Sequence, residues 1–229
     1  MTKVFTQMSI SLDGCYAGTR HDDPATWLDS QEAAAFFRVT RWVTDAMAWR
    51  ERIGVAGGET SLASRLIQRT FDRAGAYVMG RRMADAGEVP WGEEPPFRAP
   101  VFVVTHRERE TLHRRGGTSF TYVTDGLERA VELAREAAGT RDVAIAGGGS
   151  LVRQALELGL VEELELHIAP VLIGAGMRLL DVDMPLKEGI ELALDEVIET
   201  PGTLHLRYRV GERERLELDD RGGALEVGA

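Results

Sequence analysis

A short apolar run that meets three consecutive glycines constrains the fold of this chain more than any other feature. Residues 143–146 read Val-Ala-Ile-Ala, and Gly147, Gly148 and Gly149 follow directly, before Ser150 and an apolar-periodic segment. β-Branched residues favour a strand, and a serine before periodic apolar residues favours the cap of a helix. The pattern therefore predicts a strand, a tight turn and a helix start, which together form an α/β unit.

This junction has two interpretations. Glycines allow a backbone to approach a ligand closely, and the N–H groups and dipole at the start of the following helix favour a bound phosphate. Glycines between a strand and a helix are about as common in simple tight turns. Only the rest of the chain distinguishes an anion cradle from a turn.

The composition is that of a globular protein. Apolar residues make up 44% and charged residues 28% of the 229 residues, and this length suffices to bury one good-sized core. We predict one domain over residues 1–211. Residues 212–229 are charged and have weak apolar periodicity, so a mobile tail is expected there.

Charge and residue usage exclude several classes of protein. The net charge of −10 argues against binding to a nucleic-acid backbone. No apolar run approaches the ~20 residues that span a bilayer, and no secretion signal is evident, so we expect a cytoplasmic protein that contacts no membrane. The single cysteine, Cys15, excludes an intrachain disulfide and a multi-cysteine zinc site, and we predict no metal.

Apolar periodicity predicts alternating strands and helices. Helices are expected from about residue 30 to 47, from 61 to a stop at Gly75, over 127–138 after a cap at Asp125, and over 150–158. Glycines, prolines and acids predict a surface loop over residues 87–96, and His167 occupies a polar, solvated position. Strands are expected at 4–10, 76–79, 101–105, 120–123, 143–146, 164–168, 192–197 and 204–210, the last two as an antiparallel edge.

Three predicted strand ends carry residues suited to binding an anion. In an open α/β sheet, ligands bind outside the carboxyl ends of the strands, so these segments are expected to converge on one molecule. Two helix N-termini would hold a pyrophosphate, and arginines with a hydroxyl would hold a further phosphate, which favours a phosphorylated dinucleotide. The spacing matches neither the Gly-x-Gly-x-x-Gly fingerprint nor a P-loop. The segments are Gly80, Arg81 and Arg82; Thr105, His106 and Arg107; and Gly147, Gly148, Gly149 and Ser150.

Four motifs occur in the order found in a known family. They are Ser-Leu-Asp-Gly at 11–14, Tyr-Val-Met-Gly-Arg-Arg at 77–82, Pro-Val-Phe-Val-Val-Thr at 100–105 and Ala-Gly-Gly-Gly-Ser at 146–150, followed by Pro170 and Gly176. The chain resembles the dihydrofolate-reductase-like superfamily, and most closely its branch with the riboflavin-biosynthesis reductase domain. The resemblance covers about residues 3–210. It implies a three-layer α/β/α fold with a mixed, mostly parallel central sheet and antiparallel C-terminal strands.

The resemblance also implies NADPH as the cofactor. The phosphates at the first junction would meet residues 80–82, the adenosine and its 2′-phosphate would lie among residues 105–107, and the pyrophosphate would lie against residues 147–150 and Leu151. Two neighbouring glycines in this segment would share a cis peptide bond. The positions implied beside the nicotinamide are Ala17 and Gly18.

The substrate side is less well matched. Folate-reducing members place a carboxylate on the first long helix, and Asp29 and Glu32 stand at nearly suitable spacing, although acids there also serve as helix caps. Asp13 is a turn residue beside the implied nicotinamide site and a third catalytic candidate. Riboflavin-pathway reductases usually carry an acid before the glycines, where this chain has Ala146. Trp91 is expected either to cover a pocket or simply to pack.

These expectations lead to a functional hypothesis with one alternative. The chain is predicted to be an NADPH-dependent reductase that transfers a hydride to a small heterocyclic substrate, which is pterin-, folate- or pyrimidine-like. The alternative is a non-catalytic nucleotide-binding or interaction module that keeps the NADPH cradle. The resemblance further implies a homodimer.

Overall fold

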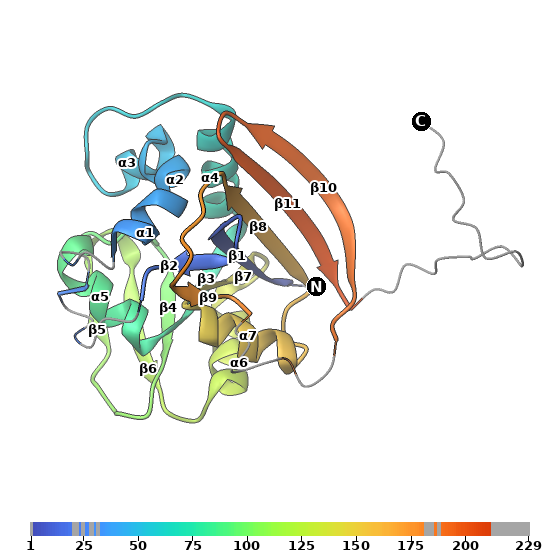
Figure 1. The fold of residues 1–229 in the computed structure, drawn as a ribbon. Coiled ribbons are helices and arrows are strands. Elements are labelled where there is room, and N and C mark those ends of the chain that lie inside the picture. Colours follow the sequence, from blue (N-terminus) through green and yellow to red (C-terminus); the bar gives the residue numbers. More distant parts are fainter. Residues whose placement is uncertain are drawn as a thin grey trace, which may run out of the picture.

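The computed structural model describes residues 2–19, 23, 26–27, 30, 33–180, 186 and 189–211, so the predicted tail lies outside it. Its centre is a nine-stranded sheet with the order β10-β11-β8-β1-β7-β3-β4-β6-β5 (Figure 1). The strands from β8 to β6 in this order run parallel, whereas β5, β11 and β10 are antiparallel to their neighbours. This arrangement confirms the predicted mixed, mostly parallel sheet with antiparallel C-terminal strands.

The strands lie close to their predicted positions. β2 and β9 form a separate two-stranded sheet. The bounds are β1 Val4–Ser11, β2 Cys15–Ala17, β3 Ala74–Gly80, β4 Pro100–Val104, β5 Leu112–His113, β6 Ser119–Val123, β7 Asp142–Gly147, β8 Glu163–Ala169, β9 Met177–Arg178, β10 Leu192–Thr200 and β11 Thr203–Val210.

Helices cover both faces of the large sheet. Ala76 and Val78 of β3 pack in one core with α6 and α7, whereas Tyr77 and Met79, on the opposite face, pack in a second core with Ala84 of α5. This gives the expected three layers. None of the helices in the described ranges is long and apolar enough to cross a membrane. The bounds are α1 Ala33–Val39, α2 Arg41–Thr44, α3 Met47–Arg52, α4 Leu62–Arg73, α5 Arg81–Trp91, α6 Leu127–Ala138 and α7 Gly149–Glu157.

The prediction of one long helix from residue 30 to 47 is wrong. The described part of this segment forms the short helices α1, α2 and the start of α3. The hydroxyl of Thr40 donates to the carbonyl of Phe36 at 2.7 Å, and that of Thr44 donates to the carbonyl of Arg41 at 3.1 Å. Such local bonds compete with the helical ladder, which explains the interruptions.

The prediction of a surface loop over residues 87–96 is also partly wrong, because α5 continues to Trp91. The indole packs over Gly87, where a Cβ would collide with the ring. Its centroid lies 4.9 Å from that of Phe97 and 6.2 Å from that of Phe120. Trp91 is therefore half-buried and packs against the core beneath α5, as in the packing alternative.

Two predicted helix ends lie elsewhere. Gly75 does not end a helix but belongs to β3, where a Cβ would lie 2.6 Å from the carbonyl oxygen of Ala138. Glycine is needed there because α6 packs directly on the strand. The N-cap of α6 is Gly126, with φ 93°, and not Asp125.

His167 is buried, contrary to the prediction of a solvated position. Its exposed fraction is 4%, and its Nδ1 lies 2.8 Å from the Nδ1 of His205 on β11. The ring of Trp42 in α2 packs against both imidazoles. Burial lowers the pKa of His167 to about 3 and that of His205 to about 4, so both rings are neutral at neutral pH. The side of the sheet to which His167 of β8 points is covered by Trp42 of α2, and this position is therefore buried.

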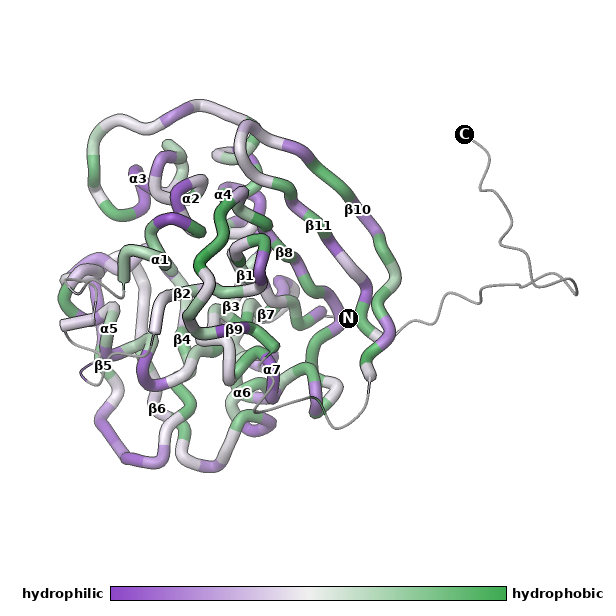
Figure 2. Tube along the Cα trace, viewed as in Figure 1, coloured by the Kyte–Doolittle hydropathy of each residue, from purple (hydrophilic) through white to green (hydrophobic). Residues whose placement is uncertain are grey.

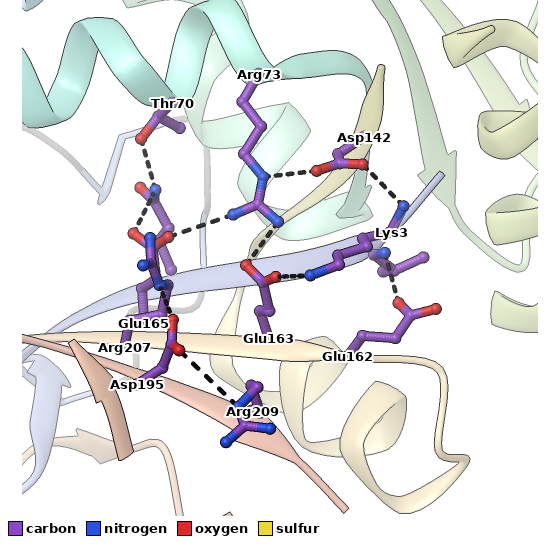
Figure 3. Close-up of polar contacts among 12 residues, drawn as sticks. Lys3, Thr70, Arg73, Asp142, Glu162, Glu163, Glu165, Asp195, Arg207 and Arg209 are labelled. Carbon is purple, nitrogen blue, oxygen red and sulfur yellow. Dashed lines mark hydrogen bonds and ion pairs between the residues drawn. The ribbon is translucent and has the colours of Figure 1, made fainter. Parts of the chain in front are cut away.

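An ionic network joins α4 to the amino ends of three strands (Figure 3). Arg73 ends α4 and binds Asp142 of β7 and Glu163 of β8, each at 2.7 Å. Lys3, directly before β1, binds Glu163 at 2.6 Å, and the Arg73 guanidinium lies 4.0 Å from the ring centroid of Phe5. These contacts fix one edge of the sheet and leave the opposite edge, at the carboxyl ends, open for a site.

Candidate functional site

The three predicted binding segments lie side by side at the carboxyl edge of the sheet. They follow β7, β3 and β4, which are adjacent and parallel (Figure 1). Residues 147–150 therefore neighbour residues 80–82, which in turn neighbour residues 105–107. Strand order alone produces the convergence that the sequence suggested.

Two helices begin at this edge in close proximity. α5 follows its N-cap Gly80, and α7 follows its N-cap Gly148. A Cβ on Gly80 would lie 3.8 Å from the carbonyl oxygen of Gly147 and 3.9 Å from the nitrogen of Gly148. The positive dipole ends of both helices thus meet in one place, which is suited to a phosphate or pyrophosphate.

Backbone donors remain at the start of α7. The first hydrogen bonds of the helix run from the N–H groups of Leu151 and Val152 to the carbonyl of Gly148, at 2.9 and 3.2 Å. The preceding N–H groups, of Gly149 and Ser150, are left for another acceptor. Ser150 lies inside the helix with an exposed side chain and is not the cap that the sequence suggested, because Gly148 occupies that position.

The three glycines differ in their surroundings. Gly147 has φ 124°, which only glycine adopts readily, and its peptide bond to Gly148 is cis, as the resemblance implied. Among the described residues, and apart from its own chain neighbours, no atom lies within 4 Å of a Cβ built on Gly148, so the space beside it is open. A Cβ on Gly149 would instead collide with the ring of Tyr16 from β2. Gly148 therefore faces the open cradle, whereas Gly149 allows Tyr16 to pack on the helix start.

Arg81, the first residue of α5, lies beside an aromatic ring and an acid. Its Nε lies 2.6 Å from Oδ1 of Asp85, one turn further along the helix. Its guanidinium carbon is 5.5 Å from the ring centroid of Tyr122 on β6. A third of the side chain remains exposed, so the cation is available at the edge of the cradle. Arg82 follows in the same turn and is half-buried.

A second arginine approaches the same ring, and no sequence pattern indicated this contact. Arg109, in the loop after β4, lies 5.3 Å from the Tyr122 centroid and binds Glu88 of α5 through both terminal nitrogens, at 2.9 and 2.7 Å. The hydrogen bond from Arg109 lowers the pKa of Glu88 and raises that of the guanidinium. Tyr122 is thus held between two cations near the ends of β4 and β6.

The segment after β4 divides into a buried residue and two exposed ones. Thr105 is buried, and its hydroxyl oxygen accepts a hydrogen bond from the N–H of Arg107 at 3.1 Å. Its own N–H donates to the carbonyl of Val123 at 3.0 Å. Thr105 therefore shapes the turn, and His106 and Arg107 present exposed side chains to solvent.

An open cleft lies beyond β2, on the side implied for the nicotinamide. It encloses about 750 Å³, open solvent included, between the end of β2, helix α1 and the loop after β8. Gly18 lines it, whereas Ala17 is buried behind it. The catalytic candidates Asp29 and Glu32 lie outside the described residues. The other lining residues are Thr19, Ala34, Ala35, Arg38, Ile173 and Ala175.

Asp13 holds one wall of this cleft. Its Oδ1 accepts from the N–H of Ile173 at 3.1 Å and from the Ser11 hydroxyl at 2.6 Å, and its Oδ2 accepts from the N–H of Gly174 at 2.7 Å. The Ser11 hydroxyl and the two N–H groups hold the pKa of Asp13 well below its usual range. These contacts favour a positioning role for an ionised carboxylate.

Within the described ranges, no three His, Cys, Asp or Glu side chains come together as a metal site would need. The described site offers helix N-termini, arginines and an adjoining cleft.

Comparison with known families matches nearly the whole chain. A family model described as the RibD C-terminal domain matches residues 2–206. Among curated proteins, the uncharacterised YyaP of Bacillus subtilis is 25% identical over 116 residues, which are 49% of this chain and 55% of that protein. The chain thus spans about half the length of this relative.

Solved structures share the fold at low sequence identity. A putative riboflavin biosynthesis protein from Shewanella sp. PV-4 superimposes with a TM-score of 0.66 at 16% identity, over 92% of this chain and 100% of that one. The riboflavin biosynthesis reductase Rib7 of Saccharomyces cerevisiae gives a TM-score of 0.54 at 12% identity, over 91% and 90% of the two chains. At these identities the likeness establishes the fold.

Proposed function

Because the chain belongs to the RibD C-terminal domain family, we propose that it is an NADPH-dependent reductase that transfers a hydride to a small heterocyclic substrate, which is pterin-, folate- or pyrimidine-like. The observation that carries the proposal is the meeting of two helix N-termini beside Gly80 and Gly147. Such a pair of dipole ends is suited to the pyrophosphate of a dinucleotide.

Each part of the cofactor has a matching group of residues. The N–H groups at the start of α7, next to the open space beside Gly148, would hold the pyrophosphate. Arg81, with the exposed His106 and Arg107 of the neighbouring segment, would hold the adenosine 2′-phosphate by charge-assisted bonds. When bound, NADPH supplies the hydride.

The remaining residues orient the reactants. The nicotinamide would lie near Ala17 and Gly18, where the cleft between α1 and the loop after β8 would receive the substrate. Asp13 fixes that loop through the N–H groups of Ile173 and Gly174, and the fixed loop would help to orient the substrate toward the nicotinamide. Asp29 and Glu32 remain the candidates for assisting protonation.

The test separates binding from turnover. We expect NADPH fluorescence to change on addition of the full-length protein, and NADPH absorbance to fall when a pterin, folate or aminopyrimidine nucleoside is added. Binding without oxidation of NADPH by any of these substrates would support the non-catalytic module, for which Ala146 in place of an acid is the motivating residue. Absence of binding would refute both functions.

A further inference from the structure

The hydroxyl group of Tyr77 is buried and has no hydrogen-bond partner among the described residues. Tyr77 lies in the middle of β3 with an exposed fraction of 4%. Its ring packs edge-on against that of Phe97, with 5.0 Å between the centroids. Burial raises the pKa of Tyr77 to about 12, so the group is a neutral O–H donor at neutral pH. A buried donor without a partner is costly, so this hydroxyl is suited to an acceptor from outside the chain.

The end of α3 brings a guanidinium to the same part of the core. Figure 2 shows a hydrophilic segment at the end of α3, where Arg52 is the last residue. Its guanidinium carbon lies 4.4 Å from the ring centroid of Phe71 on α4, and its Nη1 donates to the carbonyl of Pro96 at 3.3 Å. Because Pro96 precedes Phe97, Arg52 lies beside the segment against which Tyr77 packs.

A second guanidinium reaches β3 from the turn between α6 and β7. Nη1 of Arg141 donates to the carbonyl of Ala74, the first residue of β3, at 3.0 Å. A Cβ built on Gly75 would lie 2.8 Å from the Cβ of Arg141, so this side chain starts directly on the strand. The charges of Arg52 and Arg141 both act on the Tyr77 hydroxyl and oppose the rise of its pKa. Three separate elements thus bring two cations to one buried donor.

No acid of the described part of the chain neutralises these two cations. Neither Arg52 nor Arg141 forms an ion pair there. Asp72, the acid whose charge acts on Arg52, is exposed and accepts from the side chain of Gln68 at 2.7 Å. Arg52 is half-buried and Arg141 is exposed, so a ligand from solvent can reach both. The cluster therefore has donors and positive charge but lacks an acceptor.

We propose that the Tyr77 hydroxyl and the guanidinium groups of Arg52 and Arg141 form a binding site for a phosphate group. Phosphate offers several acceptor oxygens, and its hydrogen bonds to guanidinium groups are charge-assisted. A water molecule would satisfy the hydroxyl but leave both cations uncompensated, and a metal cation would be repelled by them. Arg98, which is exposed and lies 3.8 Å from its acid partner Glu94, adds positive charge at the rim.

This phosphate site is separate from the cradle and independent of the proposed reductase function. Ala74 begins β3 and Gly80 ends it, so at about 3.3 Å per residue the two lie roughly 20 Å apart. Arg141 likewise directly precedes β7, whose other end carries Gly147. The phosphate site therefore lies at the amino edge of the sheet, whereas the cradle lies at its carboxyl edge (Figure 1).

The first test measures stabilisation by inorganic phosphate at constant ionic strength. We expect about 20 mM phosphate, compared with chloride, to raise the melting temperature of the full-length protein by several degrees. Arg141→Gln and Tyr77→Phe should each lose most of this rise. Arg129→Gln, whose arginine pairs with Glu132 on the surface of α6, is the matched control and should keep it. Absence of the rise in the wild type, or an equal rise in every variant, overturns the proposal.

Tyr77→Phe gives a second readout in chloride alone. Because the substitution removes a buried hydroxyl without a partner, the variant should melt no lower than the wild type. A lower melting temperature would mean that the hydroxyl already has a partner within the chain, which contradicts the proposal.

Phosphate also suits the cradle, so Arg81→Ala separates the two sites. This variant should keep the phosphate-dependent rise in melting temperature, because Arg81 begins α5 at the opposite edge of the sheet. Loss of the rise in Arg81→Ala together with its retention in Arg141→Gln would place phosphate at the cradle only and refute the second site. Failure of the wild type to bind NADPH would refute the reductase function and leave this result unaffected.

Glycerol phosphate and acetate identify the source of the phosphate group. Greater stabilisation by glycerol phosphate than by inorganic phosphate would assign the site to a phosphorylated metabolite, and the reverse order would assign it to free phosphate. Either order supports the site, provided that Arg141→Gln abolishes it. Equal stabilisation by acetate at the same ionic strength would show a general effect of anions and overturn the proposal.

Discussion

The guanidinium of Arg81 is bound to the carboxylate of Asp85 one turn further along α5, with 2.6 Å between Nε and Oδ1. The pair places a cation at the start of the helix, beside the ring of Tyr122 and next to the segment after β4. In the proposed function this side chain would meet the 2′-phosphate of NADPH, so Arg81 is the first residue to test for cofactor choice.

We expect Arg81→Ala to weaken NADPH binding about 10- to 100-fold and NADH binding only a few-fold, because one charge-assisted bond to a phosphate contributes ~1.5–3 kcal/mol. Fluorescence titration with each cofactor measures the difference. The control is Arg129→Ala on the outer face of α6, where the arginine forms a surface pair with Glu132. Equal losses for the two cofactors would place Arg81 at the pyrophosphate instead.

Asp13→Asn tests the wall of the cleft. The asparagine amide offers one acceptor oxygen, whereas the carboxylate uses two for Ile173 and Gly174. We expect amide hydrogen exchange at these two residues to become at least several-fold faster, with NADPH affinity little changed. Unchanged exchange would mean that other contacts hold the loop, and would leave Asp13 as a catalytic candidate only.

The buried histidine pair predicts acid lability. Unfolded histidines take up protons near pH 6.5, whereas the pKa values in the folded state are about 3 for His167 and about 4 for His205, because burial disfavours the charged rings. Between the folded and unfolded pKa values, the unfolded state binds more protons than the folded state. The contribution of the pair to the free energy of unfolding is therefore fully present above pH 6.5 and is lost as the pH falls.

The expected loss in the free energy of unfolding between pH 7 and pH 4 is about 3 kcal/mol for each of the two histidines, since a tenfold change in proton affinity corresponds to about 1.4 kcal/mol. Urea unfolding at the two pH values measures it. His167→Gln should be less stable than the wild type at pH 7 but should lose less on acidification. An identical loss of unfolding free energy in this variant would show that carboxylates, and not the histidine pair, govern the loss of stability between pH 7 and pH 4.

Arg73→Ala should destabilise the fold without altering the site. Asp142, Glu163 and Glu165 would lose the guanidinium that joins them in Figure 3, and removal of one partner from a buried ionic network costs about 3–5 kcal/mol. Urea unfolding checks the value, with Arg129→Ala expected to change it by less than ~0.5 kcal/mol. A small effect would mean that solvent screens this network.

The sequence was most informative where an apolar pattern is compatible with only one type of secondary structure. Continuous and alternating apolar runs located the strands of the large sheet, and the motif order indicated their arrangement. The helical segment after residue 30 could not be divided correctly, because the bonds of Thr40 and Thr44 to nearby carbonyls depend on local geometry. His167 was misplaced because alternation gives the two faces of a strand but not which face a helix covers.

The segments that form the candidate site were predictable from the sequence, but the contacts between distant segments were not. Residues 80–82, 105–107 and 147–150 each follow a strand, and adjacency of β7, β3 and β4 brings them together. The contacts of Tyr16 with Gly149 and of Arg109 with Tyr122 join elements that are distant in the sequence, so no local sequence pattern predicts them. The open cleft at Gly18 likewise depends on three separate segments.

We propose that NADPH binds where α5 and α7 begin together, and a paired NADPH titration of the wild type and Gly80→Ala is the decisive test. Gly80 has φ −80° and ψ 154°, and its Cβ would meet no atom closer than 3.8 Å, so alanine is compatible with the fold but places a methyl group in the cradle. Gly189→Ala is the control, because a Cβ on Gly189 would meet no atom of the described part of the chain within 4 Å.

We predict saturable binding at micromolar NADPH for the wild type and Gly189→Ala, and at least tenfold weaker binding, or about 1.4 kcal/mol, for Gly80→Ala with an unchanged melting temperature. Absence of saturable binding by the wild type up to millimolar NADPH, or equal affinity in all three proteins, would refute NADPH binding between the starts of α5 and α7.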